Sequence, residues 1–235
     1  MQRYFVEVDN DVPLLSEEDR HHIIHVMRMK VGECFEVVDS SLVYIYEIES
    51  LTPFKVKLIE KKEEDKELEK DITLFFALAK GDKIDLVIQK CTELGVNRIV
   101  LFKSKRCVVN FDDKDVSKKL IRYQKIAKEA SEQCHRTKIP SIEGVIELKD
   151  IDKYLCDINY VAYEKEEGSM KESLSLMEDK NSVSIMIGSE GGFDKSEIEY
   201  LKERSFISIT LGKRILRCET AAIFSLSALA YEIEK

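Results

Sequence analysis

The sequence predicts an α/β protein with a small β-rich domain at its N-terminus. Over residues 1–60, short apolar and β-branched runs are separated by turn residues, whereas from residue 72 onwards strand-like runs alternate with helical ones. A nearly all-charged run at 60–70 separates the two patterns, and we expect a solvated linker or the end of a strand there, since such a run cannot bury a face in a core. We therefore expect two domains, 1–70 and 71–235, the second built on a largely parallel sheet covered on both faces by helices.

The N-terminal domain is expected to contain four strands and one helix. Ser16 and Asp19 have the spacing of a capping box, and Gly32 would end the helix that they start. The apolar face of this helix would hold His22, Ile23, Val26 and Met27. Strand-like runs lie at 4–8, 34–38, 42–48 and 56–59, with a hairpin turn at 39–41.

Three histidines in this helix, His21, His22 and His25, raise the question of a metal site. Two of them are spaced for neighbouring ligands, but no third ligand follows, nor the catalytic glutamate of an H-E-x-x-H motif. The six cysteines include no C-x-x-C pair. We therefore expect no metal, and we expect reduced thiols of the kind typical of a cytoplasmic protein.

The second domain is expected to alternate strands with helices. Asp194 and Glu197 predict a helix start at residue 195, because they have capping-box spacing and Phe193 and Ile198 flank them as a hydrophobic staple. The apolar runs predict strands at 72–79, 98–102, 160–163, 183–187 and 206–211. Helices are expected at 83–94 and 118–134, capped by Asp82 and Ser117, at 169–177, and from residues 195 and 219.

Two glycine-containing loops follow strands of this domain. The first, after 183–187, contains three glycines that can adopt positive φ and let a ligand approach the backbone, with Glu190 between them. The second begins with Gly212 and carries three cations within 213–217. Neither loop has the glycine spacing of a dinucleotide fingerprint or a P-loop. Both could be simple turns, but their composition favours a ligand site at the carboxyl edge of the sheet.

The charge is unevenly distributed along the chain. The net charge is −8, yet residues 80–138 hold 15 Lys and Arg against 8 Asp and Glu, which gives +7 for this segment. A local basic face can bind phosphates whatever the global sign, although a solvated helical surface would have the same composition. No apolar run approaches the roughly 20 residues of a membrane span, and the N-terminus lacks a secretory pattern, so we expect a cytoplasmic protein.

Several ordered motifs resemble the RsmE family of ribosomal RNA methyltransferases, which belongs to the SPOUT class. The glycine loops read I-G-S-E-G-G-F and, some twenty residues later, L-G-K-R-I-L-R-C-E-T-A-A. Further matching segments lie at 21–33, 80–96, 104–109 and 125–136. The sequence departs from the family pattern at Ser189, where proline is usual, and at Cys218, where threonine is usual. The resemblance implies a PUA-like β-barrel, an S-adenosylmethionine (SAM) site in a trefoil knot, and a homodimer.

The resemblance also implies an activity, methyl transfer from SAM to N3 of a uridine in 16S ribosomal RNA of the small subunit. Cofactor contacts would then come from Gly188, Glu190, Gly191, Gly192, Leu211, Gly212, Ile215 and Leu216, with the three aliphatic side chains on the adenine. RNA contacts would come from His22, Arg28, Lys90, Arg106 and Arg136.

Uridine N3 is a weak acid, so its methylation needs a base or a cation that stabilises the enolate. Arg217 is our candidate for that cation, with Glu219 orienting it or contacting the ligand. A salt bridge from Arg217 to Glu219 or Glu190 that only holds the loop is the structural alternative. The sequence does not identify the general base.

Two other functions stay open at this point. A SPOUT enzyme acting on another base or on transfer RNA would share the glycine loops, although the N-terminal β-rich module and the 21–33 segment favour the ribosomal enzyme. A catalytically silent RNA-binding protein would keep the fold, but both glycine loops and Arg217 are retained. A nicotinamide dehydrogenase is disfavoured, because no fingerprint loop follows the first strand of the sheet.

Overall fold

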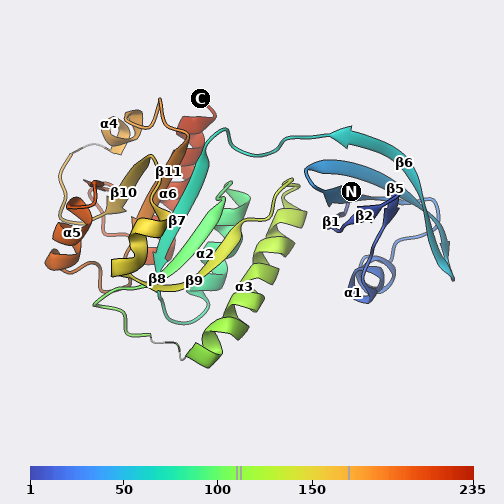
Figure 1. The fold of residues 1–235 in the computed structure, drawn as a ribbon, viewed down its shortest axis with the longest axis horizontal. Coiled ribbons are helices and arrows are strands. Elements are labelled where there is room, and N and C mark those ends of the chain that lie inside the picture. The colour runs from blue at the N-terminus through green and yellow to red at the C-terminus, as the bar shows by residue number, and fades with distance from the viewer. Residues whose placement is uncertain (110, 112, 169) are drawn as a thin grey trace. The chain divides into compact units, whose positions relative to one another are not determined.

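The computed structural model describes residues 1–109, 111, 113–168 and 170–235 (Figure 1). Its contacts divide the chain into two compact units. The first unit comprises Met1–Glu67 together with Ser131–Lys138, and the second comprises Leu68–Ala130 and Ile139–Lys235. The first unit is therefore discontinuous in sequence, because it includes the C-terminal end of a helix that begins in the second.

A four-stranded sheet forms the first unit. The strand order is β1-β4-β5-β6, in which β1 pairs with β4 in parallel and the other pairs are antiparallel. Tyr4, Phe35 and Tyr46 are buried between this sheet and the helical segment that contains Ile23. The strands are β1 (Arg3–Phe5), β4 (Cys34–Asp39), β5 (Leu42–Leu51) and β6 (Phe54–Glu63), with a separate ribbon of β2 (Val8–Asp9) and β3 (Val12–Pro13).

The predicted hairpin turn is confirmed, and the charged run at 60–70 begins as the end of a strand, one of its two expected structures. Ser40 and Ser41 both have positive φ, 49° and 70°, as the two-residue turn between right-twisted strands requires. Strand β6 extends to Glu63, where it pairs with Leu42, so the first residues of the charged run are strand. Charged side chains are compatible with an edge strand, because its pairing uses the backbone alone.

The predicted helix of the first unit starts as expected and then changes pitch. The Ser16–Asp19 capping box is present at α1 (Glu17–His21), which continues as the π-helix η1 (His22–Val26). The predicted apolar face is wrong beyond Ile23, since Val26 is 57% exposed and Met27 is exposed as well. A π-helical turn holds more residues than an α-helical one, so the side chains that follow it rotate off the buried face.

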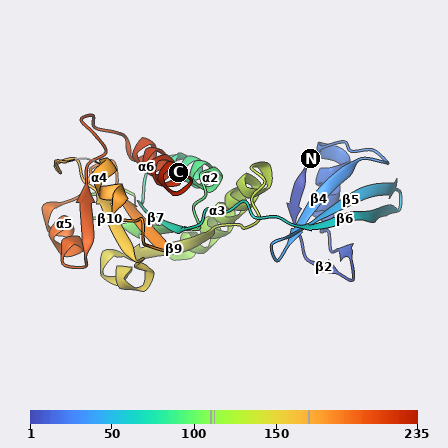
Figure 2. The same cartoon turned by 90° about the horizontal axis from the view of Figure 1, so that it is seen from above.

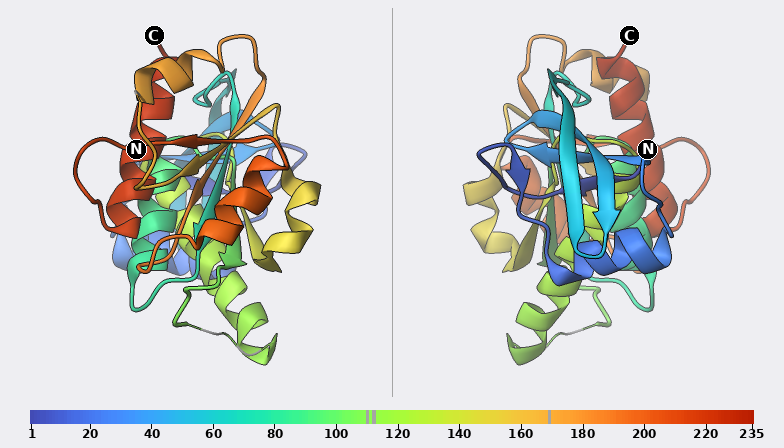
Figure 3. Two further views of the ribbon diagram at one scale, coloured as in Figure 1. Left: turned by 90° about the vertical axis from the view of Figure 1, so that its left-hand side faces the viewer. Right: turned by 90° about the vertical axis from the view of Figure 1, so that its right-hand side faces the viewer.

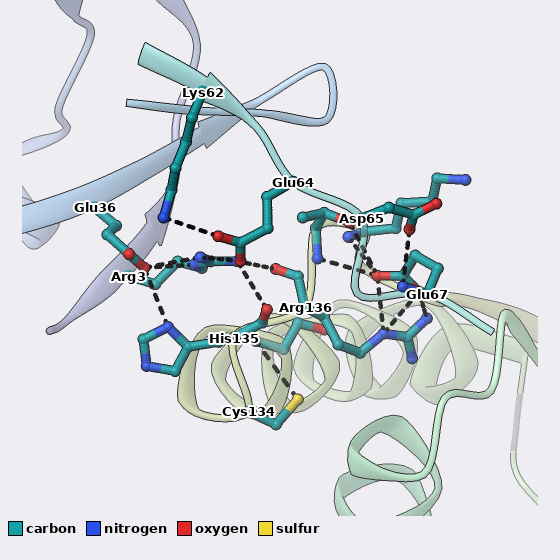
Figure 4. A network of polar contacts seen from close by, with 12 residues as sticks. Arg3, Glu36, Lys62, Glu64, Asp65, Glu67, Cys134, His135 and Arg136 are labelled. Carbon is teal, nitrogen blue, oxygen red and sulfur yellow. Dashed lines mark hydrogen bonds and ion pairs between the residues drawn. The ribbon is translucent and has the colours of Figure 1, made fainter. Parts of the chain in front are cut away.

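A network of buried charges holds residues 131–138, the end of α3 and the turn after it, in the first unit (Figure 4). Arg3 is 1% exposed and donates to Glu36 Oε2 at 2.8 Å, to Glu64 Oε1 at 2.9 Å and to the carbonyl oxygens of His135 and Arg136. Beside it, the side chains of Arg136 and Glu67 form an ion pair in which each is only 4% exposed. The Glu67 carboxylate also accepts the backbone N–H groups of residues 137 and 138.

The second unit is built on six parallel strands. Their order is β12-β10-β11-β7-β8-β9, and every neighbouring pair is parallel. All six carboxyl ends therefore lie at one edge of the sheet. The strands are β7 (Asp71–Ala77), β8 (Arg98–Lys103), β9 (Ser141–Glu147), β10 (Ile158–Ala162), β11 (Ser182–Ile187) and β12 (Phe206–Ile209).

Helices cover both faces of this sheet (Figures 2 and 3). One face, with Leu74 and Phe76 of β7, packs against α2 (Lys83–Glu93), α3 (Asp113–Gln133), α4 (Met170–Ser175) and α6 (Cys218–Ile233). The other face, with Phe75 of β7, packs against α5 (Lys195–Lys202) and the 3₁₀-helix η2 (Leu148–Tyr154). Successive residues of β7 point to opposite faces, so a continuous apolar run serves both cores.

Most predicted elements of this unit are present, with three corrections. The Asp194–Glu197 capping box of α5 is confirmed. Ser117 is not an N-cap, because α3 already begins at Asp113, where acidic residues favour a helix N-terminus. Strand β9 and helix η2 were not predicted, and β9 contains a glycine and is mostly half-buried, which weakens its pattern. The strand predicted at 206–211 is shorter than expected, since β12 ends at Ile209. The predicted helix start at residue 169 lies outside the described residues.

We expect Glu67→Gln to destabilise the protein, because the substitution leaves the buried Arg136 guanidinium without its counter-charge. Breaking a buried ion pair from one side costs about 3–5 kcal/mol. Urea denaturation monitored by circular dichroism measures the change in the free energy of unfolding. Glu69→Gln is the matched control, since Glu69 is exposed. Equal free energies of unfolding for the two variants would show that the Glu67–Arg136 pair does not hold residues 131–138 in the first unit.

Candidate functional site

A cavity of about 520 Å³ opens at the carboxyl edge of the six-stranded sheet. The loops that follow β11 and β12 form most of its wall, and the end of β10 and the starts of α2 and α6 also line it. Because these strands are parallel, loops far apart in sequence meet here, as in other α/β ligand sites. Of the predicted site residues, the cavity brings together Gly188, Glu190, Gly191, Gly192, Leu211, Gly212, Ile215, Leu216 and Arg217.

The glycine loop after β11 depends on close backbone packing. A Cβ on Gly191 would lie 2.9 Å from the Cβ of Arg106, and one on Gly188 would lie 3.0 Å from the Phe193 ring. Gly192 has a φ of +67° and donates its N–H to the carbonyl oxygen of Ser189 at 2.9 Å. Larger residues would therefore clash or be strained, so the glycines let this loop lie tightly against its neighbours.

One lysine joins the two loops electrostatically. Lys83 Nζ lies 2.8 Å from Glu190 Oε1 and 3.8 Å from Glu219 Oε2, and Glu190 also accepts the backbone N–H of Lys80. Burial raises the pKa of Glu190, but the hydrogen bonds from Lys83 and Lys80 outweigh it, and the net result is a lowered pKa. The bond to Glu190 in turn raises the pKa of Lys83. Both groups are therefore charged at neutral pH.

Cys218 lies buried in the first turn of α6 beside this charge cluster. Its thiol donates to Glu219 Oε2 at 3.3 Å. Burial and the neighbouring carboxylate raise the pKa of Cys218 to about 11. The side chain is therefore a neutral hydrogen-bond donor at neutral pH.

Arg217 is the N-cap residue of α6, and its side chain is exposed at the cavity. In the part of the chain that the structure describes, this guanidinium has no hydrogen bond or ion pair. The alternative of a loop-holding salt bridge is not realised, because Glu190 and Glu219 both face Lys83 instead. In this structure Glu219 faces Lys83 and makes no contact with Arg217. The Arg217 guanidinium is free to meet a ligand.

The loop after β12 supplies an apolar wall. Leu211 and Leu216 are half-buried and pack against the main core of the unit. Ile215 is 89% exposed, an unusual state for an isoleucine in a cavity wall. This loop therefore offers apolar side chains to a ligand in the cavity.

The residues predicted to contact RNA are dispersed over the chain. Arg106 donates to the carbonyl oxygen of Gly191 at 3.1 Å, and it therefore lies at the glycine loop. Lys90, on α2, pairs with Glu93 at 2.9 Å and does not line the cavity.

The other three belong to the first unit. His22 Nδ1 is 2.9 Å from the Tyr4 hydroxyl, and Arg28 is exposed. Arg136 requires a correction, because its side chain is buried against Glu67. A buried, paired guanidinium does not present its donors to a phosphate, so we withdraw direct RNA contact for Arg136.

Sequence reasoning missed two charged residues of the cavity, Lys83 and Glu164. Lys83 lies inside the 80–96 segment that resembles the family, but the sequence pattern assigns it no role in the site. Glu164 directly follows a predicted strand, so the rule that ligands bind at carboxyl ends of strands would have found it. Among the described residues, no group of three or more His, Cys, Asp or Glu could hold a metal ion. In the same residues, no helix has the length and apolarity needed to cross a membrane.

Two family models match the chain, one for each part. A model described as an RNA methyltransferase domain matches residues 66–230. A model described as an RNA methyltransferase PUA domain matches residues 15–61. Together with the six parallel strands, these matches confirm the predicted fold class of a PUA-like β domain followed by a SPOUT-type α/β domain.

Relatives cover the chain from end to end. Ribosomal RNA small subunit methyltransferase E of Bacillus subtilis is 36% identical over 252 residues, covering 100% of this chain and 98% of the relative. The enzyme of the same name from Buchnera aphidicola is 34% identical, covering 97% and 93%. The crystal structure of the Neisseria gonorrhoeae enzyme of that name, bound to S-adenosylmethionine, superposes with a TM-score of 0.87 at 26% identity, covering 98% and 97%.

Proposed function

Because this chain belongs to the family of ribosomal RNA small subunit methyltransferase E, we propose that it transfers the methyl group of SAM to N3 of a uridine in 16S ribosomal RNA. The observation that carries the proposal is the glycine-loop cavity in a chain that matches its relatives over their whole length. The solved Neisseria relative is bound to SAM.

The size and lining of the cavity support SAM as its ligand. Its volume lies in the range of about 300–1,000 Å³ that is usual for small-molecule sites. Leu211, Ile215 and Leu216 would pack on the adenine, and the backbone of the glycine loop would bind the polar parts of the adenosine. SAM supplies an activated methyl group when bound, so the protein has to position the uridine N3 and deal with its proton.

Arg217 is our candidate for stabilising the reacting uridine. Its guanidinium is exposed at the cavity, and the carboxylates that could neutralise it pair with Lys83 instead. As N3 loses its proton, negative charge spreads to O2 and O4 of the base. A pre-positioned cation lowers the energy of that state. Glu219, which lies behind the cavity wall at Lys83, would orient Arg217 or contact the ligand once the ligand is bound.

We assign RNA binding to the N-terminal domain, residues 1–70, and methyl transfer to residues 71–235. His22 and Arg28 in the first domain, with Lys90 and Arg106 in the second, would contact the RNA. The match of a PUA model to residues 15–61 supports RNA binding by the N-terminal domain. The net charge of +7 over residues 80–138 supports RNA contact by Lys90 and Arg106. Such an enzyme would work in the cytoplasm, where ribosomal subunits are assembled.

The protein is further proposed to be a homodimer through α6. This helix is apolar on nearly all sides, and Phe224 and Tyr231 form an exposed stripe with Ser227 at helical spacing. Exposed aromatic side chains of this kind are typical of subunit interfaces.

Sedimentation equilibrium tests the dimer. We expect twice the mass of one chain for the wild type and a single-chain mass for Phe224→Glu, because burying the new carboxylate in the interface is costly. Ile121→Glu is the matched control, since Ile121 is also an exposed apolar residue on a helix. A wild-type protein that remains monomeric at micromolar concentration would refute the dimer.

The activity is tested by incubating the protein with labelled SAM and small subunits from cells lacking the enzyme. We expect one labelled N3-methyluridine in the 16S RNA, identified by nucleoside mapping. Label at another base would move the activity to a different SPOUT reaction. Absence of SAM binding would instead support a silent RNA-binding protein.

We expect Arg217→Ala to retain SAM binding and to lower methyl transfer by about tenfold or more, since one group that stabilises developing charge is lost. Single-turnover rates and the SAM dissociation constant separate the two effects. Arg217→Lys keeps the charge and is expected to retain part of the rate. Unchanged turnover of Arg217→Ala would exclude this residue from the chemistry.

A further inference from the structure

Among the described residues, two carboxylates line the cavity, and they differ in their partners. Glu190 is occupied, because it accepts from Lys83 Nζ at 2.8 Å and from the Lys80 N–H at 3.1 Å. Glu164 follows β10 at the carboxyl edge of the sheet, and its carboxylate has no hydrogen bond or ion pair anywhere in the described ranges. Glu164 is therefore a cavity carboxylate with all its acceptor positions open.

The placement of Glu164 is constrained by the glycine loop. Both of its carboxylate oxygens lie 3.5 Å from the position that a Cβ on Gly192 would take. Both oxygens thus lie at the backbone of the loop. The cavity also contains the cationic side chains of Lys83, Lys213, Arg214 and Arg217, yet none of these forms an ion pair with Glu164. A free carboxylate in a cleft that also holds four cations is available to a donor from outside the protein.

The chemistry of the cavity changes stepwise along the sheet edge, in the strand order β12-β10-β11-β7. The apolar wall with Leu211 follows β12, Glu164 follows β10, the glycine loop follows β11, and the Lys83–Glu190 pair lies beyond β7. SAM carries its groups in a matching order, namely adenine, ribose, sulfonium and the charged amino-acid end. Glu164 lies between the apolar wall and the glycine loop, at the position that corresponds to the ribose.

We propose that Glu164 binds the ribose of the cofactor, its two carboxylate oxygens accepting hydrogen bonds from the 2′ and 3′ hydroxyl groups. A vicinal diol offers two donors at a spacing that one carboxylate can accept, and α/β folds that bind dinucleotides use an acidic residue for the ribose in the same way. The inference rests on the proposed function, because it requires that the cavity binds SAM.

Competition binding tests the assignment. Adenosine, 2′-deoxyadenosine and 3′-deoxyadenosine compete with labelled SAM for the wild type, Glu164→Gln and Glu167→Gln. Glu167 is an exposed residue of the same loop outside the cavity, which makes it a matched control. We expect Glu164→Gln to weaken SAM about tenfold, as loss of a charge-assisted hydrogen bond would. The wild type and Glu167→Gln should prefer adenosine to both deoxy compounds, and Glu164→Gln should lose most of that preference.

Three results would overturn the proposal. An equal preference for adenosine in the wild type and Glu164→Gln would show that the carboxylate does not bind the hydroxyl groups. Weaker SAM binding with unchanged adenosine binding would place Glu164 at the amino-acid end of the cofactor. A wild type that binds no SAM at all would overturn the proposed function together with this inference, whereas the first two results leave that function intact. Thermal melting of each variant confirms that it is folded.

Discussion

The parallel pairing of six strands is the constraint on which the rest of the second unit depends. It brings every carboxyl end to one edge, so the segments after β7, β10, β11 and β12 meet although up to about 130 residues separate them. Each segment then contributes a different chemistry to the same cavity. The glycines permit the close approach of one loop, and Lys83 ties that loop to α6 by facing a carboxylate from each.

Charge placement separates two roles within this molecule. In the first unit, Arg3, Glu67 and Arg136 are buried and fully paired, so they hold segments together and are unavailable to a ligand. Around the cavity, Arg217 and Glu164 are exposed and have no partner in the described part of the chain. Paired buried charges fix structure, whereas exposed unpaired charges in a cleft mark positions where an external group can bind.

The sequence was most informative where local physics decides the structure. The capping boxes at Ser16 and Asp194 and the turn at Ser40 need only neighbouring residues, and all three are present. It was least informative where packing decides. The burial of Arg136 depends on its contact with Glu67, which is far away in the sequence, and periodicity does not record such a contact. The π-helical turn after His21 has no local sequence signal that we could read. The motifs predicted the two loops of the cavity. Glu164 lies outside those motifs, and the strand order shows that the end of β10 lies beside them.

The return of residues 131–138 to the first unit bears on how the chain is made. A ribosome delivers the first 67 residues long before the segment whose carbonyl oxygens Arg3 requires. Domains usually fold in order of synthesis, N-terminal first. Here the N-terminal unit is complete only after β7, β8 and α2 have also emerged, so its last step is timed by the growth of its neighbour. The two units are separate in the folded structure, but the ribosome does not complete one before it starts the other.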